Sequence, residues 1–431
     1  MIQLKSFKNM FLVSELRNKI LFTLGVLIVD RLGNYIPVPG VDVGKLADIL
    51  SQGMLGGFFS YLDSFSSGGL SNCAIFALGI SPYITASIMM QLLTMSFPTL
   101  EAMQKEGEYG RKLINQYTRY LTLGLSLFYS ISYASMIQYQ GLALNPGIGF
   151  FLFFVIIMAT GSMFVMWLSE QISLYGIGNG ASVIIFANIV ARFPGYVAKT
   201  IKSVDLGSLS IITALFILIF ILATICCIVF LEKGERKIPV QYARRVVNNR
   251  VFGGQSSFIP FKINTVGVMP VIFASAMIQA VFGGLNLLIK KFSALSFLSD
   301  WMGLTGLIYN GLTFGLIVFF TFFYTALVFN PEELAENMKK SGGFIPAVRP
   351  GKSTAEYFDK ILNRLGLIGA LYLGVLAIIP NIMFKFIPQM PFYLGGTSLL
   401  IAVGVALEVS NQVESYLIEH RYEGFSAKKI G

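Results

Sequence analysis

The chain has 431 residues, of which 55% are hydrophobic and only 13% are charged, and its formal net charge is +10 at pH 7. A soluble domain carries roughly a quarter charged residues, and a single soluble core stops growing near about 250–300 residues. The composition therefore excludes an ordinary water-soluble globular protein and predicts an all-α polytopic membrane protein.

Ten stretches are apolar and long enough to cross about 30 Å of hydrocarbon. Four basic residues precede the first of them, and no small-residue cleavage site follows, so we expect a retained span rather than a cleaved signal peptide. The predicted spans lie near residues 20–37, 74–95, 118–138, 149–168, 180–197, 209–231, 267–289, 306–329, 363–383 and 393–412.

The distribution of basic residues predicts the orientation of the chain. Ten spans place both termini on the same side of the membrane, and cytoplasmic loops collect Lys and Arg. Residues 1–20, 96–119, 232–264, 330–364 and 413–431 contain 24 of the 32 Lys and Arg residues. We therefore expect both termini to be cytoplasmic, and we attribute the positive net charge mainly to topology rather than to nucleic-acid binding.

The segment between the first two spans is neither a span nor a simple loop. Within Met54–Gly69 the apolar spacing places one apolar face on a helix that is too short to cross the bilayer. Such a helix is either re-entrant, buried in protein or lining a cavity, or amphipathic and parallel to the interface. The residues alone leave these two alternatives open. The apolar residues are Phe58, Phe59, Tyr61, Leu62 and Phe65, and Gly68, Gly69 and Leu70 follow them.

Two predicted cytoplasmic loops, residues 232–266 and 330–362, are longer than simple connectors. Loops of more than about 12–15 residues are often functional. We interpret both as docking sites for a soluble partner; the alternative is that their charge serves orientation only. The candidate docking residues are Arg244, Arg245 and Arg250 in the first loop, and Lys339, Lys340, Arg349 and Lys352 in the second.

No motif in the chain predicts an enzyme, a metal site or a cofactor. Gly351-Lys352-Ser353 resembles the end of a phosphate-binding loop, but Pro346 occupies the position of the required first Gly. The Gly-rich run 176–180 is interpreted as a flexible entry to the fifth span. His420 has no Cys or carboxylate companions at metal-ligand spacing.

Ionisable groups are rare inside the predicted spans. Asp30, Arg31, Glu170 and Glu408 are the candidates, and each lies towards the end of its span. Ion-coupled transporters usually place such groups near the midplane, often in pairs. The pattern therefore argues against a secondary transporter.

Several collinear motifs resemble the SecY family of protein-conducting channels, and the resemblance covers nearly the whole chain. In the first half they are residues 66–70, 77–84 (ALGISPYI), 105–112 (KEGEYGRK), 116–120 (QYTRY) and 176–180 (GIGNG). In the second half they are residues 267–275 (GVMPVIFAS), 325–331 (TALVFNP) and 395–401 (GGTSLLI). Each is weak alone, but their shared order in both halves argues against chance.

The resemblance implies two inverted five-helix halves, residues 20–197 and 209–412, around a central hourglass pore. A cytoplasmic segment, residues 1–20, precedes them, and a cytoplasmic tail, residues 413–431, follows. In this family a ring of apolar side chains narrows the pore. Carried over by motif, that ring is Ile80, Ile84, Ala181, Ile185, Ile272 and Ile401. Ala181 departs from the bulky residue common at that position, which implies a locally looser ring.

The resemblance also assigns a role to the short apolar segment. Residues 58–72 would form a re-entrant plug that blocks the resting pore, with Gly68 and Gly69 as its hinge. The second and seventh spans would form a lateral gate through which signal peptides and membrane segments of nascent polypeptides leave for the membrane lipids.

The partners implied by the family are the SecA ATPase or the ribosome on the cytoplasmic side, and the small membrane subunits SecE and SecG. The implied location is the bacterial cytoplasmic (inner) membrane, although a plastid version remains open. Two rival interpretations predict other properties. A secondary transporter predicts a polar, substrate-sized cavity with paired charges, whereas a scaffold or insertase without a continuous pore leaves the Gly-rich segments unexplained.

Overall fold

Helices form both halves of the chain. The computed structural model describes residues 13–42, 44–45, 66, 68–242, 245–247, 250–252, 256–264, 266–278, 306–387 and 396–427. The first half contains α2 (Ser14–Gly33), α5 (Ser81–Ser96), α6 (Pro98–Lys105), α7 (Glu108–Tyr139), α8 (Ile148–Tyr175), α9 (Gly180–Val190) and α10 (Phe193–Asp205). The second contains α11 (Ile211–Lys233), a short helix Met269–Ile278, α14 (Leu307–Val328), α15 (Pro331–Lys340), α16 (Lys352–Phe386) and α17 (Gly396–Ala427).

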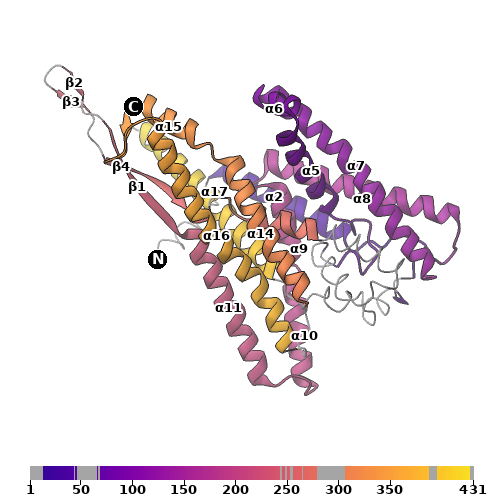
Figure 1. Ribbon diagram of the computed structural model, residues 1–431. Coiled ribbons are helices and arrows are strands. Elements are labelled where there is room, and N and C mark those ends of the chain that lie inside the picture. Colours follow the sequence, from indigo (N-terminus) through magenta and orange to yellow (C-terminus); the bar gives the residue numbers. More distant parts are fainter. Residues whose placement is uncertain are drawn as a thin grey trace.

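The two halves lie on opposite sides of the molecule. Helices α5, α7 and α8 pack together on one side, and α11, α14, α16 and α17 pack on the other (Figure 1). A large central cluster of buried apolar side chains joins them, with members from α2, α5, α8 and α9 in the first half and from α11, α14, α16 and α17 in the second. The core of the molecule therefore lies at the boundary between the halves.

The long helices suit a membrane. Among the described residues, seven helical stretches are long and apolar enough to cross a bilayer. Much of their apolar surface faces outward; on α11, for example, Ile212 is 80% exposed and Phe230 is 76% exposed. In water such an apolar surface would make the protein associate with other molecules. In a membrane the same surface contacts lipid chains, which are apolar themselves.

Each of the ten predicted spans overlaps a described helix, although the ends differ and the seventh is described only over Met269–Ile278. The first span ends earlier than predicted, at Gly33. The second begins at Ser81 rather than near residue 74, because residues 74–80 form turns and Ala74 pairs with Pro37 in an isolated bridge. Pro82 in the first turn of α5 explains this start, since proline lacks the N–H that an interior helical position needs.

The fifth span is interrupted. Helix α9 ends at Val190 and α10 begins at Phe193, with Pro194 in its first turn. Arg192 lies at the break between them.

The two long cytoplasmic loops carry secondary structure and join each other, which the sequence did not predict. Strands β1 (Glu235–Tyr242), β4 (Ser256–Lys262) and β5 (Gly343–Phe344) form one antiparallel sheet in the order β4-β1-β5. Beyond it, β2 (Arg245–Val247) and β3 (Arg250–Phe252) pair at the tip of the β1–β4 hairpin (Figure 1).

A separate apolar cluster holds this sheet on the helices. Ile238 and Val240 of β1 are 2% and 1% exposed and belong to one cluster with Met338 of α15 and Phe358 of α16. The sheet, α15 and the start of α16 thus form one platform, which we call the cytoplasmic platform.

Contacts between α2 and α17 place the two ends of the described chain at the same end of the bundle. The Lys19 ammonium donates a hydrogen bond to the Tyr416 hydroxyl at 3.0 Å and lies 4.3 Å from the centre of its ring. Nearby, Leu16 and Val413 share a small apolar cluster. This arrangement agrees with an even number of membrane crossings.

Candidate functional site

The structure brings the six predicted ring residues into one place. They come from α5 and its N-cap, from α9, from the helix Met269–Ile278 and from α17, and all belong to the central apolar cluster. Four are buried, namely Ile80 (3% exposed), Ile185 (1%), Ile272 (5%) and Ile401 (0%), and two, Ile84 and Ala181, are half-buried at its edge.

The six side chains are all aliphatic, five from isoleucine and one from alanine. Both halves of the chain contribute to them. A narrow apolar constriction resists wetting, because water and ions that enter it lose hydrogen bonds that the walls cannot replace. Branched aliphatic side chains pack closely without needing polar partners.

The Gly-rich run before α9 is a capped turn rather than the flexible entry that the sequence suggested. The side-chain oxygen of Asn179 accepts hydrogen bonds from the backbone N–H groups of Ala181 and Ser182 at 3.1 and 3.4 Å. Gly178 adopts a φ of +83°, a conformation that favours glycine. A side chain on Gly180 would collide with the Ser169 carbonyl oxygen of α8. These contacts fix the position of Ala181.

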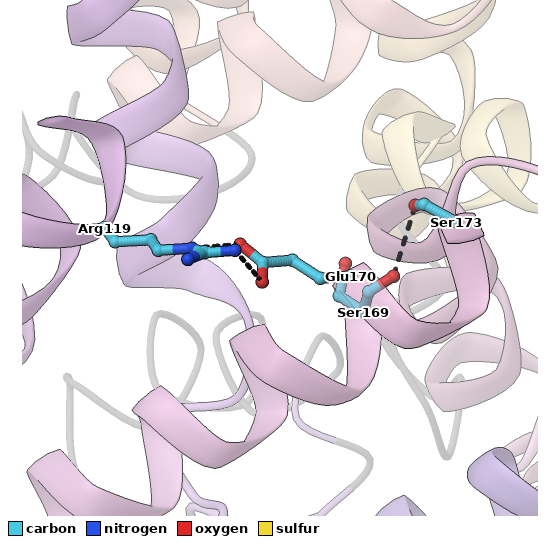
Figure 2. A network of polar contacts seen from close by, with 4 residues as sticks. All are labelled: Arg119, Ser169, Glu170 and Ser173. Atoms are coloured by element: carbon cyan, nitrogen blue, oxygen red, sulfur yellow. Dashed lines mark hydrogen bonds and ion pairs between the residues drawn. The ribbon is translucent and has the colours of Figure 1, made fainter. Parts of the chain in front are cut away.

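Polar contacts on α8 support the same turn. The Ser173 hydroxyl accepts a hydrogen bond from the Gly180 N–H at 2.9 Å and donates one to the Ser169 carbonyl at 3.2 Å (Figure 2). The Ser173 hydroxyl thus connects the start of α9 to α8.

The predicted plug lies mostly outside the described residues: Phe58, Phe59, Tyr61, Leu62 and Phe65 are among the residues that the structure does not describe. Its end is described. Gly68 has a φ of +91°, and a side chain on Gly69 would lie 2.6 Å from the Asn34 side-chain oxygen. Both predicted hinge glycines therefore occupy positions that need glycine.

The chain directly after this hinge is anchored. The Tyr133 hydroxyl of α7 donates a hydrogen bond to the Leu70 carbonyl at 2.8 Å, and the Leu70 side chain is 8% exposed. The Val38 N–H donates to the Cys73 carbonyl at 2.8 Å, and the Ile75 N–H donates to the Ile36 carbonyl at 3.0 Å. We call residues 70–75 with these partners the anchor. Sequence patterns gave no signal for it, since its partners are distant in the chain.

Most of the predicted docking cations lie on the cytoplasmic platform. Lys339 and Lys340 end α15, Arg349 precedes α16 and Lys352 begins it, and all four side chains are exposed. Arg245 and Arg250 belong to the paired strands β2 and β3, and Arg244 lies outside the described residues. The structure therefore places the four cations of the second loop on the platform and the backbone of Arg245 and Arg250 at the tip of the hairpin.

An ion pair that the sequence did not reveal connects α7 with α8. The Arg119 guanidinium donates two hydrogen bonds to Glu170, from Nε to Oε1 at 2.8 Å and from Nη2 to Oε2 at 2.7 Å (Figure 2). Glu170 thus has a partner 51 residues away. No spacing rule in the sequence connects positions that far apart.

Asp30 is a second ionisable residue in a predicted span, and the sequence did not show its burial or its hydrogen bonds. It is 2% exposed, and the Asn34 side chain, one turn later on α2, donates a hydrogen bond to the Asp30 carbonyl at 3.0 Å. Among the described residues, no group of three or more His, Cys, Asp or Glu side chains is placed to hold a metal ion.

Comparison with known proteins identifies the family. The family model described as SecY matches residues 74–410. The chain is 46% identical over 421 residues to the protein translocase subunit SecY of Escherichia coli K12, covering 95% of this chain and 94% of that protein. It is 44% identical over 425 residues to the subunit of the same name from Aquifex aeolicus, covering 97% and 98%.

Solved structures show the same fold at low sequence identity. The structure described as "The structure of a protein conducting channel" has a TM-score of 0.62 and 19% identity, and covers 93% of this chain and 92% of that one. Sec61 in the canine ribosome–channel complex from the endoplasmic reticulum has a TM-score of 0.60 and 18% identity, with the same coverage. From the matched family model and the near full-length relatives, the chain belongs to the SecY family.

Proposed function

We propose that this protein is a protein-conducting channel of the bacterial cytoplasmic membrane. It passes unfolded secretory polypeptides across the membrane and releases transmembrane segments sideways into lipid. The observation that carries this proposal is the meeting of six aliphatic side chains from four helices of both halves in one cluster. Membership of the SecY family supports it, and it supports a channel rather than an enzyme.

The ring of Ile80, Ile84, Ala181, Ile185, Ile272 and Ile401 is the constriction of the pore. In the resting channel it is a dry barrier to ions. During transport the branched side chains close around an extended polypeptide of any sequence, because aliphatic contacts are non-directional. Side-chain rotation makes such a ring adjustable without movement of the backbone.

Residues 58–72 are the plug. It pivots at Gly68 and Gly69, and the anchor holds the chain that follows. Support comes from the positive φ of Gly68, from the close approach of Asn34 to Gly69, and from the hydrogen bonds on Leu70, Cys73 and Ile75. A segment that is fixed directly after its hinge moves by rotation of the part before the hinge, which is the geometry that a plug needs.

The lateral gate lies between α5 and the helix that begins at Met269. Both helices contribute to the central cluster, so their separation opens the ring towards lipid. The channel separates membrane segments from secreted segments by their partitioning between the pore and lipid. Each Leu, Ile, Phe or Val stabilises a segment in hydrocarbon by roughly 0.3–0.6 kcal/mol, whereas each charged residue destabilises it there by about 2.5–3.5 kcal/mol.

The cytoplasmic platform docks the partner that drives transport. Arg349, Lys352, Lys339 and Lys340 present exposed cations there, and cations attract ribosomal phosphates or acidic patches of a motor protein. The partners in this proposal are the ribosome and the SecA ATPase, with SecE and SecG as small membrane subunits. A solved relative of this fold is described as a ribosome-channel complex.

Ion conductance after removal of the plug tests this proposal. Purified full-length protein and a variant without residues 58–72 are placed in planar bilayers. We expect a quiet intact channel and large, fluctuating currents from the deletion, because only the ring then closes the pore. As a matched control, a deletion of the tail residues 420–431 leaves plug and ring in place and is expected to stay quiet.

If both proteins are silent in bilayers while vesicles that contain them take up a small solute, the channel proposal fails and a secondary transporter becomes the better account.

A further inference from the structure

A cavity of about 290 Å³ with both polar and apolar walls lies outside the ring, where α11 ends against α17 and the helix Met269–Ile278 begins. Lys262, the last residue of the β4 strand of the cytoplasmic platform, also borders it. Its polar lining includes Glu232, Asn264 and Glu408. The cavity therefore borders the cytoplasmic start of the proposed gate helix.

Asn264 is the feature that indicates a ligand. The residue is 2% exposed, and its side-chain nitrogen donates to Glu232 Oε1 at 2.5 Å and to the Gly267 carbonyl at 2.9 Å. These two acceptors fix the orientation of the amide. Its oxygen, Oδ1, has no hydrogen-bond partner among the described residues. A buried acceptor without a donor is unfavourable, so the cavity is suited to a group that brings an N–H donor.

The lining places a carboxylate beside the unpartnered Asn264 oxygen. Four charged residues border the cavity, the carboxylates Glu232 and Glu408 and the lysines Lys233 and Lys262, so its formal charge is balanced. Of these four, Glu232 is half-buried, whereas the other three are exposed to solvent, so Glu232 is the charge that an entering group meets inside the cavity. The carbonyl end of α11 adds partial negative charge at the same place.

Gly404 of α17 leaves the room for this arrangement. A Cβ at this position would collide with the Val268 side chain and would lie 3.8 Å from Glu232 Oε1. The carboxylate of Glu232, on α11, therefore lies beside Gly404 of α17, a position that has no side chain. Glu408 follows Gly404 one turn later on α17. Any larger residue at 404 would fill the cavity.

We propose that Glu232, Asn264 and Glu408 receive a basic side chain from the segment that precedes the apolar core of a signal peptide. This inference rests on the proposed function. Signal peptides carry a positively charged segment directly before an apolar segment of about 7–15 residues. A Lys or Arg side chain held at the start of the gate helix keeps that charge on the cytoplasmic side and aligns the apolar segment with the gate.

Direct peptide binding tests the inference without any driving partner. The full-length channel in nanodiscs of zwitterionic lipid is titrated with two fluorescent signal peptides that share one apolar core. One begins with two lysines and the other with two glutamines. We expect the unmodified channel to bind the lysine peptide about three- to tenfold more tightly, as for partly exposed charge-assisted contacts.

Glu232→Gln combined with Glu408→Gln is expected to abolish this preference and to leave the affinity for the glutamine peptide unchanged. The matched control is Glu414→Gln, which removes an exposed carboxylate from α17 outside the cavity and is expected to keep the preference. Glu408→Lys is expected to reverse the preference towards a peptide that begins with two aspartates.

Two outcomes overturn the inference: an unchanged preference in the double variant, or equal weakening of the binding of both peptides. Failure of the unmodified channel to bind either peptide would count against the proposed function instead, so the two failures are distinguishable.

Discussion

Arg119 and Glu170 show what a single pair of residues contributes. Their two parallel hydrogen bonds fix the orientation of α7 against α8 (Figure 2). The Arg119 side chain is 51% exposed and that of Glu170 is 19% exposed, so solvent screens the charge and the geometry matters more than the attraction. Lysine cannot replace arginine in this pair, because a single ammonium group cannot donate the two parallel hydrogen bonds of a guanidinium.

A double-mutant cycle on this pair is expected to give a coupling energy of about 1 kcal/mol. Arg119→Ala, Glu170→Ala and the double variant are compared by thermal unfolding in detergent. The exposed pair Lys105–Glu101 on α6 serves as the control, with an expected coupling of about 0.3–0.5 kcal/mol. Equal coupling in both pairs would contradict a structural role for the bidentate geometry.

Tyr133 carries a second prediction at the residue scale. Tyr133→Phe removes the hydrogen bond to Leu70 and leaves a buried carbonyl with one partner fewer, at a cost of about 1 kcal/mol. If the anchor holds the plug in place, the resting leak current in bilayers rises about fivefold, which corresponds to that energy. Tyr129→Phe, one turn earlier on α7, should leave the leak unchanged; a similar rise there would refute the assignment.

At the scale of elements, glycines set how closely the helices approach. A Cβ on Gly161 of α8 would collide with the carbonyl oxygen of Ile75, and one on Gly396 of α17 would collide with that of Ala377. Backbone therefore rests directly on backbone at these crossings, as small residues allow in membrane helices. Elsewhere, as at Gly124 on α7, nothing lies within 4 Å of the added atom.

Gly161→Ala is expected to destabilise the protein by about 1–3 kcal/mol, because the rigid carbonyl of Ile75 has to move. Gly124→Ala is the matched control and is expected to be neutral or to stabilise by up to about 1 kcal/mol, since alanine restricts the unfolded chain. Unfolding midpoints in one detergent compare them. Equal effects at both positions would show that the close crossing has no energetic weight.

At the scale of the whole molecule, the function depends on the meeting of the two halves. Neither half alone encloses the central cluster, since α5 and α9 provide one side and the helix Met269–Ile278 and α17 provide the other. A change at this boundary therefore acts on permeation rather than on the stability of one half. Ala181 is the informative position, because it is the smallest member of the ring and is half-buried.

Ala181→Ile is expected to reduce the current through the channel that lacks residues 58–72 by about half or more, because the added aliphatic atoms narrow a constriction that already resists wetting. Ala187→Ile on the same helix, outside the central cluster, is the control and should leave the current unchanged. Single-channel recording distinguishes them. An unchanged current in Ala181→Ile would remove this position from the ring.

The membrane class, ten apolar helical stretches and the family were predictable from the sequence, because hydropathy and collinear motifs are local properties. The predicted start of the second span and the predicted continuity of the fifth were wrong. Pro82 and Pro194 lie in the first turns of α5 and α10, and they determine where these helices begin more strongly than hydropathy does. The ring, plug and docking residues stay predictions from the resemblance, and the anchor partner Tyr133 had no sequence signal at all.

Which distant segments meet depends on how the chain folds in three dimensions. It joined residues 232–266 and 330–362 through one sheet, paired Arg119 with Glu170, and brought Glu232, Asn264 and Glu408 around one cavity. The physical reason is common to all three. Hydropathy specifies that a segment is buried in lipid or protein, whereas the choice of partner depends on shape, on close backbone approach and on the pairing of buried polar groups, which arise only when the halves pack together.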